Sequence, residues 1–357
     1  MQGRAASPNR EFWNGRRVLV VGNTGFKGSW LSLWLHRLGG KVAGLSLPPP
    51  TKPSLFALGG LADLIPTSRV DIRDLEAVRA AVRQLQPELV FHLAAQSLVQ
   101  ASYREPVETY ATNVMGTVHV LEAMRSVPSV RCAIVVTSDK CYENHEWPWA
   151  YRETEAMGGH DPYSSSKGCA ELVTAAYRRS FFSGVGVATA RAGNVIGGGD
   201  WAEDRLLPDC MKALGAGKTI AIRNPQAVRP WQHVLEPLCG YVMLAERLHA
   251  DADAFADAWN FGPSVEEAQP VSWIASRIVE QWGDGAAWFH ACDDAPHEAA
   301  TLKVDAARAR SRLGWAPRLG LDDALAWTVE WYRRLAAGEA ALALTDEQIA
   351  RYSEVAS

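Results

Sequence analysis

Short apolar runs rich in β-branched residues alternate, along the first half of the chain, with longer stretches whose apolar positions recur every three or four residues. The short runs predict strands and the longer stretches predict amphipathic helices. The expected strands cover Arg17–Val21, Lys41–Ser46, Glu88–His92, Cys132–Thr137 and Val185–Arg191. The expected helices cover Gly25–Leu38, Asp74–Leu85, Pro106–Arg125 and Pro162–Phe182. This alternation predicts an α/β fold with a doubly wound parallel sheet, covered by helices on both faces.

The pattern changes after about Arg191, where loops rich in Gly, Pro and Asn separate the apolar runs. Helices are expected there over Arg205–Leu214, Val234–Leu248, Val271–Trp282, Asp305–Leu313 and Leu321–Arg334. We therefore expect a nucleotide-binding lobe over residues 1–190 and a smaller, substrate-binding lobe over residues 191–357. Residues 233–262 are expected to return to the first lobe.

The composition is that of a soluble globular protein, because 48% of the 357 residues are hydrophobic and 21% are charged. The formal net charge of −4 gives no general attraction to nucleic acid or to an anionic membrane. No run approaches the roughly 20 apolar residues that cross a bilayer, and the polar N-terminus does not resemble a signal peptide. The six cysteines lack metal-ligand spacing, so we expect reduced thiols, no bound metal and a cytoplasmic location.

A glycine-rich loop follows the first expected strand directly. Gly22 permits a tight turn, Gly25 lets the backbone approach a pyrophosphate, and Gly28 allows close packing of helix against strand. The helix that follows aims free N–H groups and the positive end of its dipole at the phosphates. The spacing is G-x-x-G-x-x-G rather than the standard G-x-G-x-x-G, so its place between a strand and a helix carries the prediction.

Two later segments fit the same nucleotide. Asp71 and Ile72 can hold an adenine edge, and the small residues of Leu93-Ala94-Ala95 can lie beside a cofactor. The second strand, however, ends in Gly44-Leu45-Ser46-Leu47 without the acidic residue that binds ribose hydroxyls. These residues alone therefore leave NAD and NADP as alternatives.

Candidate catalytic residues follow the fourth strand and begin the last long helix of the first lobe. Tyr163 and Lys167 are four residues apart and share a helix face. At about 5 Å and an effective dielectric of about 20, the lysine charge would stabilise a phenolate by about 3 kcal/mol. That energy corresponds to lowering the phenol pKa by about 2 units. Ser138 lies at the carboxyl end of a strand, where its hydroxyl can bond a substrate alcohol, and Asp139 can act as a general acid.

The glycine loop, the strand-end serine and the Tyr-x-x-x-Lys pair, in this order, resemble the extended short-chain dehydrogenase/reductase superfamily. Within it the chain resembles the CDP-glucose 4,6-dehydratase family of sugar-nucleotide dehydratases over most of its length. The segments that carry the resemblance are Thr24–Trp30, Thr137–Tyr142, Asp161–Glu171, Ala190–Trp201, Ile222–Pro225 and Arg229–Val234. Val21 and Asn23 depart from the Thr and His expected in this family, at positions that offer mainly backbone.

The resemblance implies a Rossmann domain that binds NAD. The implied cofactor contacts are Gly22, Thr24, Gly25, Phe26, Lys27, Gly28, Asp71, Ile72, Leu93, Ala94, Ala95, Thr137, Tyr163 and Lys167. It implies that Tyr163, helped by Ser138 and Lys167, takes the C4 hydroxyl proton of CDP-glucose while the C4 hydride passes to NAD. Water then leaves across C5–C6, with Asp139 protonating the departing oxygen, and the hydride returns to C6.

Lys140 departs from the related dehydratases, which carry Glu here as the base at C5. Either burial near Lys167 lowers the pKa of Lys140, or Lys140 stabilises the enolate while another group or a water acts as base. Both alternatives make Lys140 a catalytic residue.

Several cations and polar residues of the second lobe are candidates for holding the sugar nucleotide. Guanidinium groups suit bidentate contact with a diphosphate. The candidate substrate-binding residues are Ser138, Asn194, Arg205, Arg223, Arg229 and His297. By family resemblance, the helices over Pro106–Arg125 and Pro162–Phe182 would form a homodimer bundle, alone or within a dimer of dimers.

Two other functions compete with the dehydratase. The nearer one is a sugar-nucleotide 4-epimerase, or a dehydratase for another nucleotide; epimerases of this superfamily lack the acid that Asp139 supplies. The other is a non-enzymatic regulator that senses NAD, which would have no use for the relay of Ser138, Tyr163 and Lys167.

Overall fold

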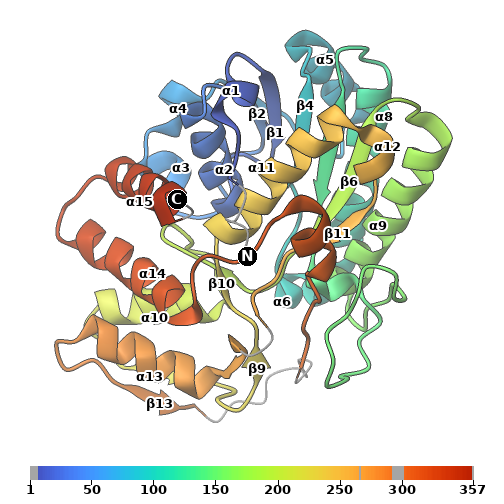
Figure 1. Cartoon of the computed structure of the whole chain (residues 1–357). Helices are drawn as coiled ribbons and strands as arrows, with labels where there is room; N and C mark the ends of the chain where they lie inside the picture. The colour runs from blue at the N-terminus through green and yellow to red at the C-terminus, as the bar shows by residue number, and fades with distance from the viewer. Residues whose placement is uncertain (1–6, 265–266, 292–300, 356–357) are drawn as a thin grey trace.

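A seven-stranded parallel sheet lies at the centre of the computed structural model, which describes residues 7–264, 267–291 and 301–355 (Figure 1). The strands stand in the order β11-β6-β5-β4-β1-β2-β3. Their bounds are β1 Arg17–Val21, β2 Lys41–Ser46, β3 Thr67–Arg69, β4 Leu89–His92, β5 Cys132–Val136, β6 Gly186–Arg191 and β11 Ala258–Asn260. The strand order reverses between β1 and β4, and ligands of such sheets bind outside the carboxyl ends of the strands at this point.

Helices cover both faces of the sheet, so the predicted doubly wound fold is confirmed. Val18 and Val20 of β1 belong to a core that includes residues of α2 (Phe26–Arg37) and α11 (Leu235–Ala250). Leu19 and Val21 point the other way, into a core that includes residues of α5 (Leu75–Leu85) and α8 (Gly116–Arg125). The alternation follows from the two-residue period of a strand.

The remaining elements are α9, which packs against α8 and β6, short connections, and a smaller second lobe that includes α10, α13 and β13 at the bottom of Figure 1. The short helices are α1 Arg10–Trp13, α3 Leu55–Leu58, α4 Leu61–Leu64, α6 Val99–Arg104, α7 Pro106–Tyr110 and α12 Ala252–Phe255, and the long ones are α9 Pro162–Phe181, α10 Leu206–Gly215, α13 Val271–Trp282, α14 Leu321–Ala336 and α15 Ala341–Val355. Three strand pairs complete the chain: β7 Val195–Ile196 with β10 Gln232–His233, β8 Ile220–Ile222 with β13 Trp288–His290, and β9 Val228–Arg229 with β12 Gln269–Pro270.

One apolar core extends through the sheet and the second lobe. Trp30 and Trp34 of α2 belong to the same buried cluster as Ile274 of α13 and Leu325 of α14. The last strand of the main sheet, β11, comes from residues 258–260, beyond the start of the second lobe. The second lobe is thus held against the sheet by shared apolar packing rather than by a linker. The lobe boundaries proposed from the sequence stay a prediction.

The structure differs from the predicted elements in several places. Strands β3 and β11 of the central sheet were not predicted, and neither were the short helices α1, α3, α4, α6 and α12 or the three strand pairs. The helix predicted over Pro106–Arg125 is divided by a π-helical turn at Ala111–Met115. The helix predicted over Asp305–Leu313 begins only at residue 307, because the Asp305 carboxylate caps it by accepting the Ala307 N–H, and it is π-helical over Ala309–Leu313. The C-terminal helix α15 was not predicted. None of the helices in the described part of the chain combines the length and apolar character needed to cross a bilayer.

Candidate active site

The glycine loop connects β1 to α2 through backbone contacts that leave no room for side chains. Gly22 has a φ of +92°, and a Cβ on it would lie 2.6 Å from the Ala94 nitrogen. A Cβ on Gly28 would lie 2.0 Å from the Gly22 carbonyl oxygen. The loop, the first turn of α2 and the residue after β4 therefore touch one another directly, which only glycine permits at these two positions.

The start of α2 is suited to a pyrophosphate. Gly25 caps the helix without any side-chain hydrogen bond, so the first N–H groups keep their capacity to bind an anion. A Cβ on Gly25 would meet nothing nearer than the Gly22 oxygen at 3.5 Å, which leaves space above the loop. Lys27 adds positive charge, although burial and the nearby Arg205 lower its pKa to about 8. These features fit the NAD predicted from the sequence.

The other predicted cofactor residues lie along the same edge of the sheet. Leu93, Ala94 and Ala95 are half-buried beyond β4, and the first two donate their N–H groups to the Val21 carbonyl. The Thr24 hydroxyl lies 2.7 Å from the Ser46 hydroxyl and donates to the Leu47 carbonyl at 2.9 Å. Its hydrogen bonds are therefore made with residues at the end of β2.

The segment after β3 carries the residues predicted to meet the adenine. Asp71 is engaged by Arg73, with 2.5 Å between Arg73 Nη2 and Asp71 Oδ2. Ile72 is buried against Gly116 of α8. An adenine contact there would therefore use backbone groups of this segment. Phe26 is half-buried and packs against the apolar core that contains Trp30 and Trp34 of α2.

Ser138, Asp139 and Lys140 form one tight turn at the carboxyl end of β5. Ser138 caps the 3₁₀ helix Asp139–Cys141 by accepting the Lys140 N–H at 3.1 Å, and its hydroxyl donates to Asp139 Oδ1 at 2.9 Å. The Asp139 side chain is buried against Gly193, where an added Cβ would lie 1.8 Å from Oδ2. A glycine after β6 is thus required for the carboxylate to occupy its place.

Tyr163 and Lys167 lie on α9, and both are buried. The helix begins at Pro162, and Asp161 caps it by accepting the Ser164 N–H at 2.9 Å. The Tyr163 hydroxyl forms a hydrogen bond with Ser138, and Lys167 Nζ donates to the Val136 carbonyl at 3.4 Å. Strand end and helix start therefore bring the hydroxyl, the phenol and the amine together.

The expected lowering of the phenol pKa is wrong for the protein alone. Burial raises the pKa of Tyr163 to about 12, and the side-chain hydrogen bond with Ser138 offsets only part of that rise. Burial and the charge of Lys27 lower the pKa of Lys167 to about 7, so near neutrality the amine is often uncharged. The lysine four residues away was expected to stabilise the phenolate, but the fold desolvates both groups, and desolvation favours their uncharged forms.

A cavity of about 300 Å³ opens beside this turn. Asp139 and Lys140 line it from one side, Asn194 lines it from the loop after β6, and Arg229 lines it from β9. Four predicted catalytic or substrate residues thus meet at one cavity, whereas Ser138, Tyr163 and Lys167 do not line it. Asn194 adopts a φ of +47°, and the Arg229 guanidinium donates to the Val228 carbonyl at 3.1 Å.

The remaining predicted substrate residues are placed differently. Arg205 Nη1 lies 3.0 Å from Asp200 Oδ2, and its charge reaches both Tyr163 and Lys27. Arg223 is exposed, pairs with Asp204 at 3.8 Å, and does not line the cavity. The predicted role of His297 falls outside the described residues.

Sequence reasoning missed several residues around the cavity. His160 lies in it with its Nε2 3.0 Å from Glu143 Oε1, and Tyr142 forms part of its wall. Behind the turn, Glu171 and Arg191 form a buried ion pair. The only available signal was position: Glu171 continues the four-residue spacing of Tyr163 and Lys167.

Comparison with known proteins gives concordant results. Residues 19–328 match the family described as GDP-mannose 4,6 dehydratase. The chain is 51% identical over 351 residues to a CDP-glucose 4,6-dehydratase of Salmonella typhimurium, covering 96% of this chain and 98% of the relative. It is 26% identical over 332 residues to a dTDP-glucose 4,6-dehydratase of Xanthomonas campestris, covering 88% and 92%.

Solved structures share the fold. A UDP-glucose 4-epimerase of Thermus thermophilus in complex with NAD superimposes with a TM-score of 0.75 at 25% identity, covering 89% of this chain and 99% of that one. A dTDP-glucose 4,6-dehydratase double mutant of Streptomyces venezuelae, also with NAD bound, gives a TM-score of 0.77 at 23% identity, covering 90% and 98%. Epimerases and dehydratases thus share this architecture, and side chains of the site must distinguish them.

We expect the variant Gly28→Ala to lose NAD binding selectively. The added methyl group would lie 2.0 Å from the Gly22 oxygen, so the loop must shift away from its anion-binding position. We expect NAD affinity, measured by quenching of tryptophan fluorescence, to fall by at least about tenfold. Gly215→Ala, a helical position with no heavy atom within 4 Å, is the control and should bind NAD normally. Unchanged affinity in Gly28→Ala, with the fold intact by circular dichroism, would refute this assignment.

Proposed function

This chain belongs to the family described as GDP-mannose 4,6 dehydratase, and from that premise we propose that it converts CDP-glucose to CDP-4-dehydro-6-deoxyglucose and water. One observation carries the assignment to elimination rather than epimerisation: a buried carboxylate, Asp139, lies in the same turn as the strand-end hydroxyl that meets Tyr163. An epimerase needs only the hydroxyl, phenol and amine. A dehydratase also needs an acid for the departing oxygen.

The first half of the reaction uses the buried relay. Tyr163 accepts the C4 hydroxyl proton. The Ser138 hydroxyl, which forms a hydrogen bond with Tyr163, binds the same C4 hydroxyl of the substrate. Lys167, close behind the phenol on α9, stabilises the phenolate when it carries its proton. When bound, NAD would supply a reversible hydride acceptor for the oxidation at C4 and the reduction at C6. Gly22, Gly25 and Gly28 would hold its pyrophosphate, and the N–H groups at the start of α2 would bind it.

The second half uses the turn residues that face the cavity. A ketone at C4 acidifies the neighbouring C5–H, which allows a base to remove that proton and water to leave from C6. Asp139 donates the proton to the departing oxygen, and the adjacent Ser138 hydroxyl orients its carboxyl group. Lys140 lines the cavity next to it and is proposed to act at C5, as a base or by stabilising the enolate.

The nucleotide part of the substrate needs cations and polar groups around the cavity mouth. Arg229 and Asn194 line the cavity, and Arg205 places its charge near the relay, so we assign these three to the diphosphate and sugar. Arg223 is exposed, so we propose that it contacts at most the part of the nucleotide that lies farthest from the sugar. The preference for cytosine is supported by the 51% identity to the Salmonella typhimurium enzyme over nearly the whole chain.

We further propose that the protein forms a homodimer through α7, α8 and α9. Val107 of α7 is 81% exposed, Leu172 of α9 is 62% exposed, and Met115, in the π-helical turn between α7 and α8, is 48% exposed. Such exposure is unusual for apolar side chains on neighbouring helical segments. Val107→Glu should convert the dimer to a monomer in size-exclusion chromatography with light scattering. The exposed Leu58 of α3, changed to Glu as a control, should leave the dimer intact. A monomeric wild-type protein would contradict the proposal.

The substrate assignment predicts a single product from a panel of nucleotide sugars. Purified protein supplied with NAD and with CDP-glucose, dTDP-glucose, UDP-glucose or GDP-mannose should form a 4-keto-6-deoxy sugar, followed by NMR, from the CDP compound at the highest kcat/KM. Asp139→Asn should lower that kcat by about 10²–10⁴-fold, the range general acid catalysis contributes. Formation of the C4 epimer without loss of water, or a preference for another base, would reject the assignment.

A further inference from the structure

Glu171 and Arg191 form a buried ion pair directly behind the catalytic turn. Their side chains are 5% and 4% exposed. Arg191 Nε lies 2.9 Å from Glu171 Oε1, and Arg191 Nη2 lies 2.8 Å from Glu171 Oε2, which is the bidentate geometry of a strong charge-assisted contact. No step of the proposed reaction uses either residue.

Each oxygen of Glu171 accepts one further bond from a threonine hydroxyl. Thr137 Oγ1 donates to Oε1 at 2.5 Å, and Thr189 Oγ1 donates to Oε2 at 2.7 Å. Thr137 follows β5 and immediately precedes Ser138, whereas Thr189 lies within β6. The same carboxylate is therefore attached to the start of the catalytic turn and to a strand beside it.

Arg191 uses its third nitrogen on the other end of the turn. Nη1 donates to the Tyr142 hydroxyl at 2.7 Å, and the guanidinium carbon lies 4.9 Å from the centre of the Tyr142 ring. Tyr142 follows the 3₁₀ helix Asp139–Cys141 directly. One ion pair thus reaches the residue before Ser138 and the residue after Cys141.

We propose that the Glu171–Arg191 pair is a positioning device that fixes the turn Ser138–Cys141 against α9. Glu171 lies one helical turn beyond Lys167 and two beyond Tyr163, so the helix face that carries the relay also anchors the turn that carries the hydroxyl and the acid. The registry between Ser138 and Tyr163 is then set by a rigid connection rather than by loop conformation. This inference rests on the proposed roles of Ser138 and Asp139.

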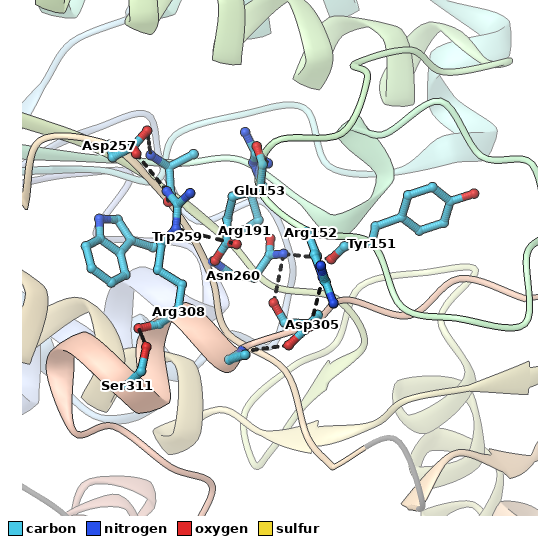
Figure 2. A network of polar contacts seen from close by, with 12 residues as sticks. Tyr151, Arg152, Glu153, Arg191, Asp257, Trp259, Asn260, Asp305, Arg308 and Ser311 are labelled. Carbon is cyan, nitrogen blue, oxygen red and sulfur yellow. Dashed lines mark hydrogen bonds and ion pairs between the residues drawn. The ribbon is translucent and has the colours of Figure 1, made fainter.

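A network around Asn260 extends the anchor to the second lobe. The Tyr142 hydroxyl donates to Asn260 Oδ1 at 2.7 Å, and Asn260 Nδ2 donates to the carbonyls of Tyr151 at 2.9 Å and Asp305 at 3.1 Å. Figure 2 shows Asn260 between Arg191 and Asp305, with Arg308 bonded to Asp257 beside it. The wall of the cavity at Tyr142 is thereby tied to the stretch that follows residue 300.

Stability alone gives little reason for such a pair. Desolvating two charges offsets most of their attraction, and apolar residues of similar volume often stabilise a protein equally well. What apolar residues cannot supply is a set of directed bonds to both ends of one turn. The geometry therefore favours a role in placing reacting groups, where small displacements can cost about 10²-fold in rate.

Thr137 and Thr189 provide a matched pair of variants. Both are buried, and both donate one bond to Glu171, but only Thr137 adjoins the turn. Thr137→Val should raise amide hydrogen exchange in the peptide spanning residues 138–142 by about tenfold. At saturating NAD it should also lower kcat for CDP-glucose at least about tenfold, with KM for the sugar nucleotide little changed. Thr189→Val should leave both quantities within about twofold of wild type, and Thr137→Ser, which keeps the hydroxyl, should restore them.

Exchange and turnover separate the possible failures. A wild-type protein that dehydrates no nucleotide sugar refutes the proposed function, while the exchange comparison still decides whether the pair holds the turn. Equal exchange in both valine variants, a normal kcat in Thr137→Val, or no rescue by serine would overturn the positioning role.

Discussion

The packing of the Asp139 carboxylate against the backbone of Gly193 is the contact on which the site depends. It places an acid in the same turn as the Ser138 hydroxyl, and it buries that acid at the carboxyl end of the sheet. Any side chain at residue 193 would occupy the space of the carboxylate, since a Cβ there lies 1.8 Å from Oδ2. The loop after β6 therefore determines whether the turn after β5 can carry an acid at all.

The charges around this acid also follow from the fold. Arg205, at the start of α10, acts on Tyr163 and on Lys27 of the first turn of α2, and Lys27 in turn acts on Lys167 of α9, through a largely desolvated region. Burial lowers the pKa of both lysines, to about 8 and about 7, because neither charge is fully compensated by the protein. A site of this kind favours anionic ligands, which agrees with a cofactor and a substrate that both carry a diphosphate.

Five of the seven strands of the sheet and most first-lobe helices could be predicted from periodicity, because β1 and β2 begin and end where the apolar runs do. Strands β3 and β11 were missed because three residues are too few to show a period. The relay could be predicted from spacing on one helix. The anchor of Glu171 and Arg191 could not, because buried charges are rare and their partner residues lie on separate elements. The pKa of Tyr163 was missed for a related reason: the sequence shows a nearby lysine but not how much water the fold removes. Helix α15 was not predicted, although its buried positions recur every three or four residues and pack against α2, α3 and α14. Two of those positions, Thr345 and Gln348, are polar, which weakens the apolar stripe in the sequence.

The central claim is that one hydrogen leaves C4 of the sugar and returns to C6 of the same molecule, with Asp139 expelling water in between. The most direct test mixes CDP-[4-²H]glucose with an equal amount of CDP-[¹³C]glucose that carries no deuterium. The products are analysed by NMR and mass spectrometry. The account predicts deuterium at C6 of the ¹²C product and none in the ¹³C product. A 6-deoxy product whose C6 hydrogen comes from solvent, or from a second sugar molecule, would contradict it.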